Sequence, residues 1–564
     1  GIRDSTRLVG SEMCIRDRYI HEPQKRHPPV CAGGIKGSAK MSKWKGRIPG
    51  LVITLVMAVV VAAFIAVLTW TKMVPANLLI LGSVAVAMLA AAAALLVRNT
   101  AFKVQFTLGT ILAVLLTAVL AVGGYYLYAT ASTLSRMSET RTQSTPVAVY
   151  VRAEDAAQSV QDTAGYTFGI LSSLDRENTD RGLAEIETAL GGAVQTKEFA
   201  GITQLADGLL AGECDAIVMN LAYIDVIGET EGYTDFESKV RELEILHVES
   251  EKQKTGVLAD SGSADVQEVY TLYISGSDSR EGLYTVGRSD VNILATINTK
   301  TRQVLLVTTP RDYFVPLSIS DGVPDKLTHA GIYGVDVSIE TLEMLYETDI
   351  DYYFRLDFTG FKGIIDALGG ITLNNDIAFS TSKYDYPVGA NTLGGDEALQ
   401  FARERYSFID GDIQRGKNQM KVISAVIEKA MSPDILMNYT SILESLEDCF
   451  DMNVPYNDIA ALVRRQLSEG GSWNVVQYSV TGYGDTQVPY SMSMEVYVMQ
   501  PDYETVHKAQ ELMDRVENGE TITQADTELP VDESYSTDDS ADALDGSSAY
   551  GDYTYTGTDS SYGY

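Results

Sequence analysis

Three long apolar runs near the N-terminus constrain the fold more than any other feature of the sequence. Residues 48–70, 77–97 and 106–128 each reach the length of about 20 apolar residues that a helix needs to cross a bilayer. A cleaved signal peptide is an alternative for the first run, but that run is too long for such a peptide and two further runs follow it. We therefore expect three membrane-spanning helices within residues 41–130 and a location in the cell membrane.

Basic residues beside these runs indicate their orientation. Lys43, Lys45 and Arg47 precede the first run, and Arg98 and Lys103 lie between the second and the third. Because Lys and Arg are enriched on the cytoplasmic side of membrane proteins, we expect a cytoplasmic N-terminus. The chain after about residue 130 is then expected on the extracellular face.

The formal net charge of the chain is −33. Phosphate binding along nucleic acids needs a net basic surface, so the charge argues against nucleic acid as the partner. Residues 517–564 are acidic, rich in Ser, Gly and Tyr and almost free of aliphatic residues, which predicts a disordered acidic tail. Residues 1–40 show no apolar periodicity and are interpreted as a non-native leader before Met41.

Residues 145–255 alternate short β-rich runs with helical patterns, as in "PVAVYVR", "YTFGILS" and "CDAIVMN". Such alternation predicts a layered βαβ module with a buried sheet. The order of these segments resembles the periplasmic solute-binding proteins of the two-lobed type, although the module is shorter than that fold. A ligand-sensing role and a spacer role both stay open, and we assign no ligand residues here.

The stretch "RSDVNILATINTKTRQVLLVTTPRD", residues 288–312, predicts a β-hairpin, since two runs rich in β-branched residues flank a polar turn. Arg288 and Asp290 begin the first strand, and Arg311 and Asp312 follow the second, so all four are expected at the open end of the hairpin. The β-rich run before the hairpin ends at Asp278, which is expected at the same edge. The alternative is a set of surface ion pairs of little energetic value.

A second Arg-rich stretch, "EALQFARERYSFIDGDIQRGKNQ", favours a binding site. Arg403 and Arg405 face one side if the chain is extended there. A helix is expected after Asp412, its predicted N-cap, with Arg415 and Gln419 on one face. An Arg near a helix N-terminus is suited to a phosphate, because the unpaired N–H groups add to its charge.

Together, the motifs "GSDSR", "GRSDVNILATIN", "LLVTTPRDYFV", "DKLTHA", "LGGDEALQFARERYSF" and "GDIQRGKNQ" resemble the LytR-CpsA-Psr family of membrane-anchored enzymes of Gram-positive bacteria. The resemblance covers about 170 residues in the family's order. It implies an α/β domain over residues 266–435, with helices around a central sheet, and residues 436–516 as its C-terminal extension. It also implies transfer of a glycopolymer, of the teichoic acid or capsule type, from undecaprenyl pyrophosphate to peptidoglycan.

The resemblance also implies roles for individual residues. Magnesium is expected at Asp278 and Asp290, and catalysis at Asp290, Arg311 and Asp312, with either Asp290 or Asp312 as the base. Asn418 departs from the family, because many relatives carry Arg there. The residues implied to bind the phosphates are Arg288, Arg311, Lys326, Arg403, Arg405, Arg415 and Gln419.

Two other functions stay open on the sequence. One is a sensor or attenuator of cell-wall synthesis, in which the first module detects a ligand. The other is a polyprenyl-pyrophosphate pyrophosphatase, because water and a sugar hydroxyl make nearly the same demands on a site.

An apolar stripe of Phe358, Phe361, Ile364, Ile365 and Leu368 has near-helical spacing. Core packing explains such a stripe, and the family resemblance implies that apolar side chains also line a lipid tunnel. Further along the chain, residues 435–465 are expected to be helical.

Overall fold

The computed structural model describes residues 48–98, 102–137, 143–250, 267–277, 282–409, 411–432, 446 and 449–529. The predicted leader, residues 1–40, and residues 530–564 of the predicted tail lie outside the described residues. The chain divides into two compact units. One contains residues 1–62 and 84–121, and the other contains residues 63–83 and 122–564.

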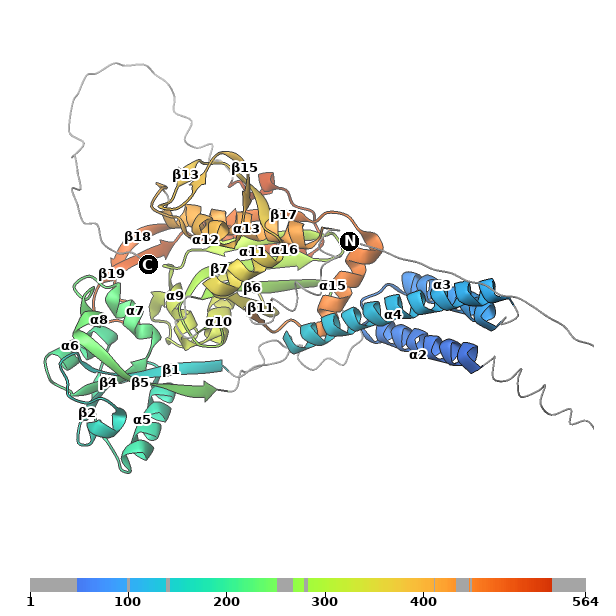
Figure 1. The fold of residues 1–564 in the computed structure, drawn as a ribbon. Coiled ribbons are helices and arrows are strands. Elements are labelled where there is room, and N and C mark those ends of the chain that lie inside the picture. The colour runs from blue at the N-terminus through green and yellow to red at the C-terminus, as the bar shows by residue number, and fades with distance from the viewer. Residues whose placement is uncertain are drawn as a thin grey trace, which may run out of the picture. The chain divides into compact units, whose positions relative to one another are not determined.

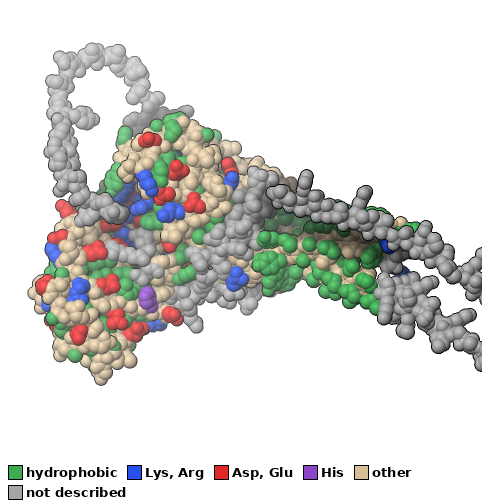
Figure 2. All heavy atoms as spheres, in the orientation of Figure 1, with side chains coloured by type: hydrophobic (Ala, Val, Ile, Leu, Met, Phe, Trp, Pro, Cys, Tyr) green, Lys and Arg blue, Asp and Glu red, His purple; other side chains and the backbone are tan. Residues whose placement is uncertain are grey.

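The three predicted membrane-spanning helices are confirmed as helices long and apolar enough to cross a membrane. They are α2 (Ile48–Trp70), α3 (Ala76–Arg98) and α4 (Lys103–Met137). Large apolar side chains on them are exposed, among them Leu51 and Val104 at 71% each. Figure 2 shows this cover of hydrophobic side chains along the helices. A surface of this kind suits lipid rather than water.

The module after these helices forms a five-stranded sheet in the order β3-β2-β4-β1-β5. Strands β2, β3 and β4 are parallel, as expected for βαβ units, and β1 runs antiparallel to both of its neighbours. Strand β5 was not predicted from the sequence. The bounds are β1 (Gln143–Arg152), β2 (Thr167–Leu171), α5 (Arg176–Leu190), β3 (Gln195–Phe199), α6 (Ile202–Leu210), β4 (Ala216–Asn220), α7 (Ala222–Gly228), α8 (Phe236–Lys239) and β5 (Val240–Ser250).

A second, six-stranded sheet has the order β16-β11-β6-β7-β8-β17 and mixes parallel with antiparallel pairs. Its centre is the hairpin that the sequence predicts, and that prediction is confirmed by the pairing of β7 with β8. The bounds are β6 (Val269–Ser277), β7 (Ser289–Asn298), β8 (Gln303–Thr309), β11 (Tyr352–Leu356), β16 (Phe450–Met452) and β17 (Asn474–Ser479).

Helices cover both faces of this sheet, as Figure 1 shows. Leu294 and Leu305 face one side and pack in a common core with α10 (Val335–Tyr346) and α16 (Tyr503–Glu517). Ile293 and Leu306 face the other side and pack with α13 (Gly411–Ala430). Successive strand residues point to opposite faces, which explains this division into three layers. Two more helices, α11 (Phe358–Ala367) and α12 (Gly395–Arg403), pack against each other, and α12 also packs against α13.

Several sequence-based boundaries are wrong. Residues 435–465 are not one helix, because β16 precedes α15 (Tyr456–Glu469) within that range. Within the predicted extension, residues 436–516, β16 and β17 form the two edge strands of the six-stranded sheet. The predicted tail begins too early: residues 518–529 are described, and Ile522 is fully buried in the core beside α16. The sequence-based prediction missed this because Ile522 is a single buried aliphatic residue in a segment of mostly acidic and polar residues.

Candidate functional site

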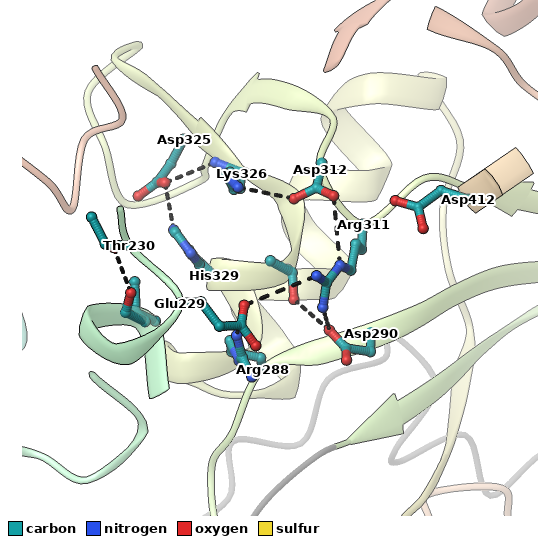
Figure 3. Close-up of polar contacts among 12 residues, drawn as sticks. Glu229, Thr230, Arg288, Asp290, Arg311, Asp312, Asp325, Lys326, His329 and Asp412 are labelled. Carbon is teal, nitrogen blue, oxygen red and sulfur yellow. Dashed lines mark hydrogen bonds and ion pairs between the residues drawn. The ribbon is translucent and has the colours of Figure 1, made fainter. Parts of the chain in front are cut away.

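The open end of the β7–β8 hairpin brings together the residues predicted there. Arg311 Nη1 lies 3.0 Å from Asp290 Oδ1, and Thr328 of α9 (Leu327–Ala330) donates a hydrogen bond of 3.2 Å to the same oxygen. Strand β6 ends beside the start of β7, where Ser277 pairs with Ser289. The predicted meeting of these strand ends at one sheet edge is therefore confirmed, although Asp278 itself lies outside the described residues. Figure 3 shows the cluster.

Asp312 and Lys326 lie behind this edge. Lys326 Nζ is 3.1 Å from Asp312 Oδ1, and Arg311 Nε is 3.5 Å from Asp312 Oδ2. The side chain of Asp312 is only 7% exposed. Next to Lys326, the side chain of Asp325 pairs with His329 at 2.7 Å, which gives that histidine a structural partner. Neither Asp312 nor Lys326 is among the residues that line the cavity described below.

Arg403 and Arg405 reach the site from the C-terminal end of α12. The helix ends at Arg403, and Glu404 is extended with φ −65° and ψ 129°. Both Arg side chains were expected to face one side if the chain is extended there, and this condition is met. The Arg403 guanidinium lies 4.4 Å from the ring centre of Phe358, and that of Arg405 lies 4.8 Å from the ring centre of Tyr406. Stacking of this kind orients a guanidinium, and Arg405 Nη2 is held further by the hydrogen bond of 2.7 Å that it donates to the hydroxyl of Tyr406.

The first turns of α13 supply Arg415 and Gln419. Helix α13 begins at Gly411, so Asp412 lies inside its first turn and the N-cap prediction for Asp412 is wrong. Arg415 Nη2 is 3.4 Å from Asp412 Oδ1, and Gln419 Nε2 donates to the carbonyl oxygen of Ala402 at 3.4 Å. Asn418 is buried and accepts a hydrogen bond from Gln414. Position 418 does not line the cavity, so the Asn there leaves the lining charges unchanged.

The charges of the cluster change the acidity of its members. Burial by itself would raise the pKa of Asp290, but Arg311, Arg288 and Arg415 hold that pKa below its ordinary value. Burial and the neighbouring positive charge of Arg311 lower the pKa of Arg415, against the effect of Asp412. An Arg whose positive charge is disfavoured by its own neighbours gains when an anion binds beside it.

A cavity of about 460 Å³ lies beside this cluster. The polar residues that line it are Glu229, Ser277, Arg288, Asp290, Arg311, Asp357, Arg403, Arg405, Tyr406, Arg415 and Gln419. Seven of these eleven side chains were named from the sequence as candidates for the site. Within the described residues, the structure therefore gathers Asp290 and every predicted phosphate-binding residue except Lys326 around one cavity.

The rest of the cavity wall is apolar. Four of the five stripe residues line it, namely Phe358, Phe361, Ile364 and Ile365, while Leu368 packs in an adjoining core. Helix α13 also contributes apolar lining residues, Val422, Ile423, Val426 and Ile427. Core packing explains part of the stripe, because Phe361 and Ile364 also pack against the cores of this domain. That the cavity holds a lipid stays a prediction. The cavity therefore joins a cluster of guanidinium groups to an apolar wall.

The carboxylate of Asp290 offers one ligand to a magnesium ion. Both hydrogen bonds that Asp290 makes with described residues use Oδ1, which leaves Oδ2 for a cation. Hard carboxylate oxygens of an ionised Asp are the ligands that magnesium prefers. Within the described residues, no group of three or more His, Cys, Asp or Glu side chains gathers around a common point. Asp290 would therefore hold the ion together with phosphate oxygens, as is usual for magnesium at phosphate sites.

Sequence reasoning missed Glu229 and Thr328. Glu229 follows α7 of the first module, and its Oε2 lies 2.7 Å from Arg288 Nη1. No local pattern marks it, because 58 residues separate the two in the chain. Thr328 belongs to the motif "DKLTHA", next to His329. Its place in that motif is the sequence signal that could have identified it as a site residue.

Comparison with known proteins places the chain. The LytR_cpsA_psr family model matches residues 233–514. The polyisoprenyl-teichoic acid–peptidoglycan teichoic acid transferase TagU of Enterococcus faecalis is 31% identical over 226 residues, which are 40% of this chain and 74% of that protein. TagU of Bacillus cereus is 33% identical over 221 residues, which are 39% of this chain and 72% of that protein. The crystal structure of TagV from B. subtilis has a TM-score of 0.39 at 26% identity and covers 45% of this chain and 99% of that one. The chain belongs to the LytR_cpsA_psr family.

Proposed function

We propose that this protein is a membrane-anchored phosphotransferase that moves a glycopolymer from undecaprenyl pyrophosphate to peptidoglycan. The observation that carries the proposal is the junction of the guanidinium cluster with the apolar wall of the cavity. A polyprenyl pyrophosphate has the same two halves, a doubly charged head and a long apolar tail. Relatives named as teichoic acid transferases support a polymer of the teichoic acid type.

The cluster suits the head group of such a donor. Arg311, Arg405 and Arg415 present planar donors that can bind two phosphate oxygens at once. Phosphoryl transfer spreads negative charge over the transferred oxygens, so fixed positive groups stabilise the transition state more than the ground state. The apolar wall from α11 and α13 would hold the first isoprene units and keep the head at the guanidinium cluster.

In the proposed reaction, a sugar hydroxyl of peptidoglycan attacks the phosphorus that carries the polymer. A new P–O bond to the acceptor forms, the bond to the bridging oxygen breaks, and polyprenyl phosphate leaves. Of the two candidate bases, Asp290 lines the cavity and Asp312 does not. We therefore assign Asp290 as the group that accepts the proton. Asp312 contacts Arg311 and is assigned the role of holding that side chain in position.

The low pKa of Asp290 makes it a weak base but keeps it ionised. A loose phosphoryl-transfer transition state needs positioning more than a strong base, so this is compatible with catalysis. A bound magnesium ion at Asp290 Oδ2 would neutralise charge on the pyrophosphate. The basic flanks of α2 and the α3–α4 connection support an extracellular face for the site, where peptidoglycan lies.

A transfer assay tests the proposal. The full chain in detergent is given a labelled undecaprenyl-pyrophosphate saccharide and short peptidoglycan chains, with and without magnesium. We expect magnesium-dependent label on peptidoglycan, and a loss of about 10³-fold in Arg311→Ala, because a buried cation at the transferred phosphate is removed. Arg302→Ala, at the opposite end of the same hairpin, is the matched control and should retain full activity.

The other outcomes separate the alternatives. Label released to water without acceptor labelling would show a pyrophosphatase. Tight donor binding without turnover would favour a sensor. If Arg311→Ala is folded and as active as Arg302→Ala, the site assignment fails.

A further inference from the structure

One residue of the five-stranded module contacts the guanidinium cluster of the six-stranded domain. Glu229 comes directly after α7, and its carboxylate lies between two guanidiniums, 2.7 Å from Arg288 and 4.0 Å from Arg311 (Figure 3). It also lines the same cavity. Glu229 is the only residue of the five-stranded module among those described at this cavity.

Contacts around α7 hold this carboxylate in place. Asn220, just before α7, donates a hydrogen bond of 3.2 Å to the carbonyl oxygen of Ile332, and the buried hydroxyl of Tyr223 lies 3.1 Å from that of Tyr333. Ile332 and Met492 of the second domain pack inside the core of the module. A further polar contact joins Thr203 of α6 to Ser493 at 2.7 Å. The helix that carries Glu229 is thus fixed to the domain that carries the cluster.

In this contact, a carboxylate of the protein occupies a position at which the guanidinium groups can bind an external anion. A carboxylate oxygen bound by guanidinium N–H groups makes the interaction that a phosphate oxygen would make. The two partners differ in exposure: the side chain of Glu229 is 56% exposed, whereas that of Arg288 is 8% exposed. The carboxylate can therefore turn into solvent while Arg288 stays, and an incoming phosphate can take its place.

We propose that Glu229 is an internal anion that occupies part of the phosphate site and is displaced when the pyrophosphate of the donor binds. The inference rests on the proposed function, because it requires that this cluster bind pyrophosphate. Competition by Glu229 lowers the affinity for every phosphate ligand. It favours ligands with enough negative charge to compete, so the module sets the threshold of donor binding.

Titration of inorganic pyrophosphate into the full chain, followed by calorimetry, tests this inference without any need for turnover. We expect Glu229→Gln to bind pyrophosphate about tenfold more tightly than the wild type, a coupling of ordinary size between two sites. Glu229→Ala should shift the affinity in the same direction. Glu231→Gln, two residues away on the same exposed loop, is the matched control and should bind like the wild type. Arg311→Ala should lose binding.

Three results would overturn the inference, and they differ in whether they also contradict the proposed phosphate site. Unchanged or weaker binding in Glu229→Gln, with binding still lost in Arg311→Ala, leaves the proposed phosphate site intact and makes Glu229 a productive or neutral residue. Equal tightening in Glu231→Gln would show a general charge effect. Binding that is absent in all variants, or unaffected by Arg311→Ala, removes the phosphate site and the proposed function together.

Discussion

Asp290 belongs to the six-stranded domain and Asp175 to the five-stranded module, and the surroundings of the two carboxylates are opposite. Asp290 lies at the start of β7 beside Arg311, with Arg288 and Arg415 near. Asp175 precedes α5 in the first module, and its carboxylate accepts hydrogen bonds from the amides of Asn178 and Asn220. The pKa of Asp290 is held below its ordinary value by the guanidiniums, whereas burial raises the pKa of Asp175 to about 6.

Burial acts on both carboxylates in the same direction, so the difference comes from their partners. Neutral amides offset the loss of hydration of Asp175 only in part, while full positive charges more than offset it at Asp290. The six-stranded domain therefore maintains a permanently ionised site with excess positive charge. The module has a carboxylate that gains a proton near pH 6. Three predictions test this contrast.

Asp290→Asn should have the largest effect. The amide keeps the shape of the side chain but removes its charge, so transfer should fall by about 10²-fold or more. Without magnesium, the same variant should bind inorganic pyrophosphate at least as tightly as the wild type, since one negative charge has left the site. The enhancement of binding by magnesium should disappear. Transfer assays and calorimetry on the full chain measure both effects.

The control for this variant is Asp321→Asn, which changes an exposed aspartate with a φ of 50° that Asn also tolerates. It should leave transfer and binding unchanged. Normal magnesium-dependent transfer by folded Asp290→Asn would show that the charge of Asp290 has no part in the reaction, and the contrast with Asp175 would lose its functional meaning.

Asp312→Asn should affect stability. Burial alone would raise the pKa of Asp312, but Lys326 and Arg311 lower it, so its stabilising effect is present above the ordinary Asp pKa and is lost as the pH falls through the lowered folded value. At pH 7 the variant leaves Lys326 without its carboxylate, and unfolding free energy should drop by about 3 kcal/mol. The deficit should shrink below about pH 4. Urea denaturation followed by Trp473, the tryptophan of this domain, measures it.

The double variant Asp312→Asn with Lys326→Met sharpens this test. Removal of both charges spares the domain an unpaired buried cation, so the double variant should be more stable than Asp312→Asn alone. A deficit of equal size at pH 7 and pH 3 would contradict the assignment, because it would come from packing rather than from the charge of Asp312.

Much of the site could be predicted from the sequence because its geometry is local. The β7–β8 hairpin joins Asp290 to Arg311 through a short turn, and antiparallel pairing puts the start of β7 and the end of β8 at one edge. The helical stripe from Phe358 to Ile365 was legible for the same reason, since 3.6-residue periodicity is a property of one segment.

The parts that could not be predicted depend on contacts distant in the sequence. Glu229 meets Arg288 only because α7 docks on the second domain through Tyr223 and its neighbours. Lys326 pairs with Asp312 and does not line the cavity, and this position depends on the path of the loop after β8. Strand β16 is three residues long, too short for a period to show, and Ile522 is an isolated anchor within an acidic segment.

Asp175→Asn should have the smallest effect and the opposite sign. Because the folded pKa of Asp175 is raised to about 6, the folded module binds more protons than the unfolded chain between about pH 4 and pH 6. The stability of the module therefore falls as the pH rises through that window, by on the order of 2 kcal/mol, and stays lower above it. Asn does not titrate, and it tolerates the positive φ of 48° at this position.

Hydrogen exchange of the β4 amides, compared between variant and wild type at each pH, measures this difference directly. We expect Asp175→Asn to match or exceed wild-type protection at pH 7 and to fall behind at pH 4, where the protonated carboxyl of the wild type costs nothing. Glu185→Gln, an exposed change on α5, should show no such crossing. If the two curves run parallel from pH 4 to pH 7, Asp175 stays ionised throughout. Amide partners would then stabilise a carboxylate as well as guanidiniums do, and positive charge would not explain the contrast with Asp290.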